Sequence, residues 1–112
     1  MTAIEVVQAQ LEAYNRRDLE PFLKLFSETV QIFRMPALEP SILGKSQFAD
    51  FYATQRFNRS GLRADLVNRI AFGNKVIDHE RIHGVLAEAF EIVVVYEVID
   101  GLIQTMWAYS VD

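Results

Sequence analysis

The alternation of apolar and polar residues predicts a long β-hairpin at the C-terminus. Residues 90–99 and 102–111 are rich in β-branched and aromatic side chains and flank the pair Asp100-Gly101. This pair tolerates the positive φ angles of a type I′ turn, so it predicts a two-residue loop. With that loop, one face of the hairpin carries Ile92, Val94, Tyr96, Thr105, Trp107 and Tyr109. The opposite face carries Val93, Val95, Met106 and Ala108, with Glu97 and Ser110.

Both faces of this hairpin are mostly apolar, so neither is expected to lie in water. One face is expected to cover a core or pocket beneath helices. The other needs a second layer, which we expect from another copy of the chain, through Val93, Val95, Met106 and Ala108. The sequence therefore predicts a homodimer.

Upstream of the hairpin, the apolar spacing changes to three and four residues, which is typical of helices. Ile4, Val7, Leu11 and Tyr14 form such a stripe, and Thr2 with Glu5 fits a capping box at its start. The expected elements, in order, are helices at 2–14 and 18–26, a strand at 30–33, a loop at 35–44, a helix at 45–60 and strands at 62–72 and 75–84. Three helices followed mainly by a meander predict an α+β fold, with a curved sheet around the helices.

Length and composition narrow the class of protein. The 112 residues are expected to form one domain spanning 1–112, with no linker or repeat. A net charge of −4 argues against nucleic acid and anionic membranes as partners. No apolar run is long enough to cross a bilayer, no basic start precedes an apolar block, and cysteine is absent. We therefore expect a cytoplasmic protein without disulfides or thiolate chemistry.

The concentrated ionisable cluster is Asp78-His79-Glu80-Arg81-Ile82-His83, on the strand at 75–84. Alternation places His79, Arg81 and His83 on one face and Asp78 with Glu80 on the other, and it leaves open which face lines a pocket. In a functional interpretation, His79 is a general base or hydrogen-bond donor and Arg81 an anion clamp. In the alternative, the strand is exposed, with an Arg69–Asp78 cross-strand pair, or forms the rim of a dimer.

Aromatic residues suggest a ligand pocket between helices and sheet. The candidates for its lining are Tyr14, Phe33, Tyr52, Tyr96, Trp107 and Tyr109, with the polar candidates Arg34, Asn68, His79 and Arg81. Alternatively, these aromatics are only core residues. On a strand, His79 and His83 would lie about 13 Å apart, so no shared metal is expected. No glycine-rich phosphate loop is present, and we expect no cofactor.

Several segments resemble one family. They are Ala13-Tyr14-Asn15-Arg16-Arg17-Asp18-Leu19-Glu20, the strand that ends at Pro36, residues 76–84 (VIDHERIHG) and residues 96–103 (YEVIDGLI) before Trp107. The chain resembles the nuclear transport factor 2-like (NTF2-like) superfamily, and within it the SnoaL-like, steroid-isomerase-like bacterial branch. The resemblance implies a cone-shaped antiparallel or mixed sheet around three N-terminal helices, as in a cystatin-like α+β barrel. It does not fix an activity, because this fold hosts isomerases, dehydratases, epoxide hydrolases, polyketide cyclases and binding modules.

The resemblance also implies positions where known activities of the family would need catalytic residues. For ketosteroid isomerisation the base would lie just before Pro36, where Phe33-Arg34-Met35 has no acid; the tyrosine would fall near Gln10 and the buried acid near Val94. For the limonene-epoxide-hydrolase branch, Arg81 matches an arginine, but His83 and Tyr109 stand near the two aspartate positions. The sequence thus argues against the first mechanism and weakens the second.

Two functional hypotheses remain. In the first, a cytoplasmic homodimer binds a small apolar or aromatic molecule, and His79 with Arg81 or Arg34 catalyses proton transfer on it, as an isomerase, cyclase or hydrolase would. In the second, the chain is a non-catalytic ligand-binding or dimeric assembly module. The position of His79 separates the two hypotheses: a side chain inside a closed apolar cavity favours chemistry, and one in solvent or at a dimer interface favours the module.

Overall fold

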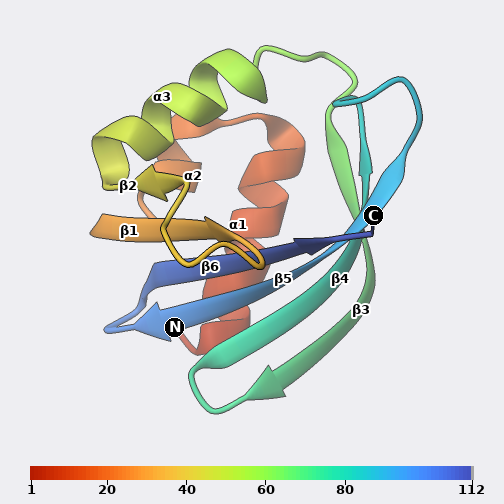
Figure 1. The fold of residues 1–112 in the computed structure, drawn as a ribbon. Helices are drawn as coiled ribbons and strands as arrows, with labels where there is room; N and C mark the ends of the chain where they lie inside the picture. Colours follow the sequence, from red (N-terminus) through yellow and green to blue (C-terminus); the bar gives the residue numbers. More distant parts are fainter. Residues whose placement is uncertain (112) are drawn as a thin grey trace.

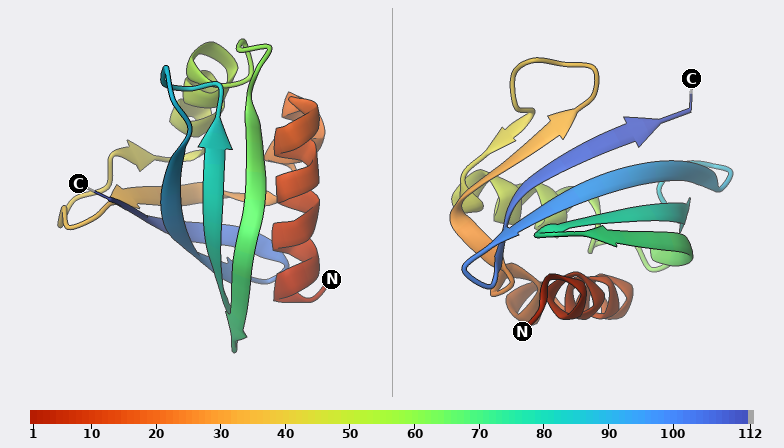
Figure 2. Two further views of the ribbon diagram at one scale, coloured as in Figure 1. Left: turned by 90° about the vertical axis from the view of Figure 1, so that its right-hand side faces the viewer. Right: turned by 90° about the horizontal axis from the view of Figure 1, so that it is seen from below.

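The computed structural model describes residues 1–111 and has three helices on one side of a curved six-stranded sheet (Figures 1 and 2). In chain order the elements are α1 (Ala3–Arg16), α2 (Leu19–Leu23), β1 (Phe26–Arg34), β2 (Ile42–Leu43), α3 (Lys45–Gln55), β3 (Arg63–Phe72), β4 (Lys75–His83), β5 (Phe90–Ile99) and β6 (Leu102–Ser110). The strand order is β2-β1-β6-β5-β4-β3. All strand pairs are antiparallel except β1 with β6, so the sheet is mixed. The expected α+β class with a curved sheet is confirmed, and the sheet is open rather than a closed barrel.

The helices are anchored by caps and by burial of one face. Thr2 and Glu5 form the expected capping box at the start of α1, with each side chain bonded to the other residue's backbone N–H. The buried face of α1 includes Val6, Val7 and Leu11. Helix α2 is shorter than expected, because the chain enters β1 at Phe26, and α3 ends at Gln55.

An aromatic cluster fills the space between α2, α3 and β1. Phe22 is fully buried and stacks on Phe48 at 5.7 Å between ring centroids, and Phe26 and Tyr52 pack against the same pair. Rings in tilted and stacked contact of this kind contribute roughly 1 kcal/mol per pair beyond their burial. This cluster fixes α3 over the sheet, and so positions the pocket described below.

A close backbone contact holds the end of β4 against the segment that leads into β3. Gly84 has φ of +84°, and a Cβ atom there would lie 2.4 Å from the carbonyl of Gly61. Only glycine fits such a contact. This contact fixes the far end of the β3–β4 pair.

The C-terminal hairpin forms as expected at its turn, but its register changes further along. Asp100 and Gly101 both have positive φ, as a type I′ turn requires, and Ile99 pairs with Leu102. An irregularity at Glu97/Val98 then shifts the pairing by one residue, so that Tyr96 faces Met106 and Val95 faces Trp107. A one-residue shift moves every later side chain of one strand to the other face.

This bulge corrects two expectations about the faces of the hairpin. Met106 and Ala108 were expected on the outer face, but they line the pocket on the inner face. Trp107 was expected inside, but it lies on the outer face beside Val95 and stacks on Phe33 at 6.3 Å. Val93 and Val95 are on the outer face, as expected.

Candidate active site

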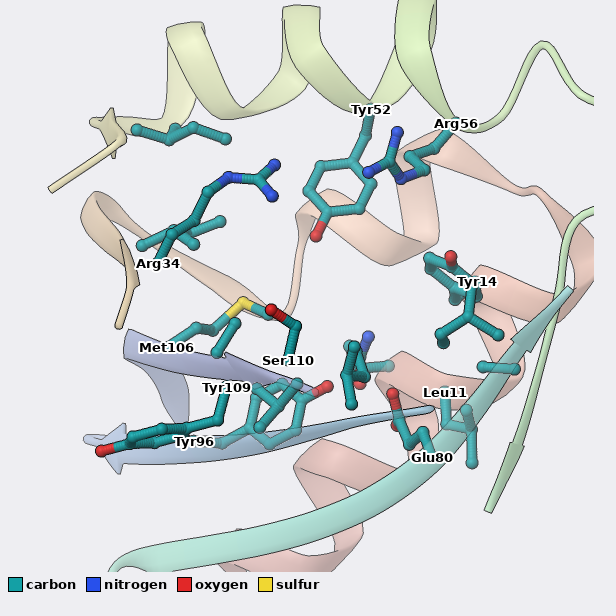
Figure 3. Close-up of a pocket in the computed structure, with 18 of the residues that line it drawn as sticks. Leu11, Tyr14, Arg34, Tyr52, Arg56, Glu80, Tyr96, Met106, Tyr109 and Ser110 are labelled. Atoms are coloured by element: carbon teal, nitrogen blue, oxygen red, sulfur yellow. The ribbon is translucent and has the colours of Figure 1, made fainter. Parts of the chain in front are cut away.

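A pocket of about 240 Å³ lies between α1, α3 and the inner face of the sheet (Figure 3). Its walls are mainly apolar and include Leu11, Ile82, Val94, Met106 and Ala108. Its open side lies near Arg34, Tyr109 and Ser110, which are exposed. The volume is below the range typical of pockets for drug-sized molecules, so it suits a compound of one or two rings.

Glu80 is the carboxyl group of this pocket. It projects from β4 toward the interior (Figure 3), and only 4% of the residue is exposed. Burial, with a smaller contribution from the charge of Asp78, raises the pKa of Glu80 from 4.5 to about 8, against the opposing effect of Arg69. At neutral pH this carboxyl therefore holds its proton most of the time.

Two buried polar atoms at the pocket lack a hydrogen-bond partner within residues 1–111. They are Oε2 of Glu80 and Oε1 of Gln10, and both residues line the pocket. An unpaired buried polar atom costs roughly 1–3 kcal/mol, so native proteins rarely keep one without a reason. A polar group of a ligand, or water, in the pocket would remove this cost.

Tyrosine hydroxyls provide the hydrogen-bond donors. Tyr14 from α1 and Tyr52 from α3 line the pocket on the side of the helices, and Tyr96 lines it from β5 (Figure 3). Burial raises the pKa of Tyr52 to about 12 and raises those of Tyr14 and Tyr96 as well. These phenols therefore stay protonated and can donate to an oxygen atom that gains negative charge.

A buried ion pair supports the strand that carries Glu80. Asp78 is fully buried, and its two carboxylate oxygens accept hydrogen bonds from Arg69 Nε and Nη2 at 2.7 and 2.8 Å. Arg69 Nη1 also donates to Gln8 Oε1 at 2.8 Å, which ties the pair to α1. The expected Arg69–Asp78 cross-strand pair is therefore present, and it lies on the same face of the sheet as Glu80.

Some of the site residues predicted from the sequence line the pocket, and others do not. Tyr14, Arg34, Tyr52, Tyr96 and Tyr109 all line the pocket. Phe33, Asn68 and Trp107 do not line it. Phe33 and Trp107 stack on each other on the outer face, and Asn68 is exposed on β3 opposite His79.

His79 and Arg81 also lie away from the pocket. Nε2 of His79 contacts Oε1 of Glu91, and Nη1 of Arg81 reaches Oε2 of the same carboxylate at 3.3 Å. These side chains are partly solvent-exposed on the outer face, with His83 bonded there to Asp65. Within residues 1–111, no group of three or more acidic or histidine side chains is placed to hold a metal ion.

Three polar residues of the pocket that the sequence did not single out for it are Glu80, Gln10 and Arg56. A signal for Glu80 was present in the strand itself. Val76, Asp78, Glu80 and Ile82 share a face whose two ends are apolar, whereas the face with Lys75, His79 and Arg81 is polar along most of its length. The apolar ends mark the buried side.

The fold and the sequence together define a class of protein. The chain matches the family model of the SnoaL-like domain over residues 7–106, and so it belongs to that family. A comparison with curated proteins finds no significant match. Within residues 1–111, no helix is long and apolar enough to cross a membrane.

Solved structures with the same fold include proteins of different activities. A candidate ketosteroid isomerase of Kribbella flavida has a TM-score of 0.83 and 20% identity, over 98% of this chain and 78% of that one. An NTF2-like protein of Cytophaga hutchinsonii has a TM-score of 0.83 and 14% identity, over 99% and 91%. An LEH-like epoxide hydrolase of Mycobacterium tuberculosis has a TM-score of 0.81 and 23% identity, over 97% and 82%. At these identities the likeness shows the NTF2-like fold alone.

Proposed function

We propose that the protein catalyses proton transfer on a small, largely apolar molecule held in the pocket, with Glu80 as the acid–base group. The observation that carries the proposal is a buried carboxyl with a pKa near 8 and an unpaired oxygen in an apolar cavity. A general acid or base works best when its pKa lies near the working pH. The outward positions of His79 and Arg81 remove the geometric reason to assign them this role.

The pocket supplies the parts of an enolisation. Ionised Glu80 takes a proton from the carbon next to a carbonyl group, and the electron pair of the C–H bond moves onto the carbonyl oxygen. A phenol O–H of Tyr14 or Tyr52 donates a hydrogen bond to this oxygen as it becomes negative. Protonated Glu80 then returns a proton to the same carbon or to another, which restores the carboxylate.

Exchange of hydrogen for deuterium in a model ketone tests this role. We expect the protein to accelerate exchange of the α-protons of 2-tetralone in D₂O, followed by NMR, with a rate that rises as pH approaches 8. Glu80→Gln should lower the rate about a hundredfold or more, because general acid–base groups contribute factors of that size. His79→Ala and Glu91→Gln are matched controls on the outer face and should retain the rate. Loss of exchange in His79→Ala but not in Glu80→Gln would refute the assignment, and no exchange with the intact protein would favour a binding module.

We also propose that the outer face of the sheet joins two copies of the chain. Phe33, Ile77, Val93, Val95 and Trp107 are only partly covered there, and Ile70 and Phe72 on β3 are 55% and 76% exposed. The face also carries charges of both signs, Lys75 beside Glu97 and Arg81 beside Glu91. A two-fold interface brings one patch against its own copy, so apolar and mixed-charge parts of this kind complement themselves.

Val95→Glu should break this assembly, because it places a carboxylate in the centre of the apolar area. We expect light scattering coupled to gel filtration to show a dimer for the wild type and a monomer or aggregate for Val95→Glu. Val111→Glu makes the same exchange at a residue that is 85% exposed and should remain a dimer. An intact, soluble Val95→Glu dimer, or a monomeric wild type, would contradict the proposal.

A further inference from the structure

Two arginines on the helix side of the pocket have no acidic partner within residues 1–111. Arg34 at the end of β1 and Arg56 at the end of α3 both line the pocket. The ion pairs found within residues 1–111 involve Lys45, Arg63, Arg69, Lys75, His79, Arg81 and His83, and neither Arg34 nor Arg56. Both guanidinium groups therefore line the pocket without a compensating carboxylate among the described residues, although the chain carries a net charge of −4.

The two guanidinium groups lie near the same aromatic ring. Their Cζ atoms lie 5.9 Å (Arg34) and 4.9 Å (Arg56) from the centroid of the same ring, that of Phe51. Cation–π contacts at these distances hold both planar groups near the ring without neutralising them. Figure 3 shows them on either side of Tyr52, on the helix side of the pocket, with Glu80 on the sheet side.

Burial at this place destabilises the charged form of Arg56. Within residues 1–111 its guanidinium donates a hydrogen bond only to the adjacent carbonyl of Gln55. The residue is half-buried, and burial lowers its pKa. The nearby charge of Arg34 acts in the same direction. An anion bound by both guanidinium groups would reverse both effects, because its negative charge stabilises the charged form of each arginine.

We propose that Arg34 and Arg56 form an anion-binding subsite at the mouth of the pocket, and that its ligands are small ring compounds with a carboxylate group. The carboxylate binds the guanidinium groups, the ring system fills the apolar pocket, and the opposite end of the molecule reaches Gln10 and Glu80. The proposal rests on the proposed function for the identity of the site, and it adds the class of substrate. It makes neutral steroid-like molecules poor ligands on two grounds, their size and their lack of charge.

Paired probes of equal shape test the charge preference. Calorimetry with 2-naphthoate and with its neutral counterpart 2-naphthamide should show that the wild type binds the carboxylate about tenfold more tightly, as expected for charge-assisted hydrogen bonds to a carboxylate. The double variant Arg34→Gln/Arg56→Gln should lose this preference and still bind the amide. Added salt should reduce the preference in the wild type, because the mouth is partly open to solvent.

The controls separate this proposal from the proposed function. Arg59→Gln removes an arginine just after α3 that does not line the pocket, and it should keep the preference. Glu80→Gln should also keep it while losing proton exchange, so failure of catalysis and failure of anion binding give different results. Equal binding of both probes by the wild type, a preference that survives in the double variant, or binding of neither probe would overturn the proposal. Unchanged melting temperatures of the variants would show that the effects are not due to unfolding.

Discussion

Replacing Arg69 with methionine should destabilise the protein by roughly 3–5 kcal/mol, the cost of leaving one member of a buried ion pair without its partner. Asp78 is fully buried, and both of its carboxylate oxygens are bonded to Arg69. Methionine keeps much of the apolar volume of the arginine stem but leaves the Asp78 charge uncompensated. It also removes the cation that opposes protonation of Glu80, so the pKa of Glu80 should rise further. Urea unfolding near neutral pH measures the loss.

A second arginine pair provides the control. Arg63 and Asp65 are joined by two hydrogen bonds of 2.9 and 3.2 Å, similar to those of Arg69 and Asp78, but their side chains are 59% and 48% exposed. Surface pairs of this kind contribute about 0–1 kcal/mol, so Arg63→Met should have a small effect. The double variant Arg69→Met/Asp78→Asn should recover part of the lost stability because it removes the buried charge. Equal losses for Arg69→Met and Arg63→Met would show that the buried pair has no special importance.

The sequence predicts the architecture well because its strong signals of secondary structure are local. The helical stripe of α1, its capping box and the Asp100-Gly101 turn are each encoded within a few neighbouring residues. The resemblance to the NTF2-like superfamily then supplies the order of elements. The parallel pairing of β1 with β6 joins strands some 75 residues apart, and no local pattern encodes it.

The errors arise where alternation carries no information. The strands of the last hairpin are apolar on both faces, so the sequence gives no penalty for a shift of one residue at Glu97/Val98. That bulge exchanges Trp107 with Met106 between the two faces. A similar irregularity between Leu66 and Asn68 shifts the pairing of β3 with β4. In the C-terminal hairpin the two-residue turn was predicted correctly, and the error begins at the bulge.

Only part of the candidate site could be predicted from the sequence: the tyrosines were found and Glu80 was not. Tyrosines indicate a pocket because they combine a large apolar ring with a polar end. The four tyrosines proposed from the sequence, Tyr14, Tyr52, Tyr96 and Tyr109, all line the cavity. A buried glutamate looks like an exposed one in a sequence, and Glu80 alternates with His79 and Arg81, whose chemistry is more familiar. Val76 and Ile82 determine which face of β4 is buried, because both of these apolar residues point into the core. The carboxyl between them follows because side chains on a strand alternate.

Glu80 should make the free energy of unfolding depend on pH, and the isosteric variant Glu80→Gln should remove this dependence. The pKa of this carboxyl is about 8 in the folded protein and 4.5 in its ordinary, unfolded environment. Below 4.5 both states bind the proton, so the group does not affect the free energy of unfolding. Between the two values the unfolded state binds fewer protons than the folded state, so stability falls as pH rises, by up to about 1.4 kcal/mol per pH unit. Above the folded value the full loss is present.

Glu80→Gln keeps the shape of the protonated side chain and cannot ionise. It should therefore match the wild type at acidic pH and be more stable by several kcal/mol near pH 8, roughly 3 or more, when both are unfolded with urea across this range. Taking the difference between the two curves cancels carboxyls such as Asp65, whose pKa is lowered mainly by its hydrogen bond to Arg63 and which titrates in both proteins. Glu91→Gln, at the partly exposed carboxylate beside His79 and Arg81, should instead give a curve close to that of the wild type.

Parallel curves for wild type and Glu80→Gln would mean that Glu80 is solvated and ionised at neutral pH, and the acid–base role would then lose its basis. A separation that grows as pH rises from 4.5 toward 8 would show that the fold bears a cost to keep this carboxyl protonated, as expected for a group retained for its chemistry.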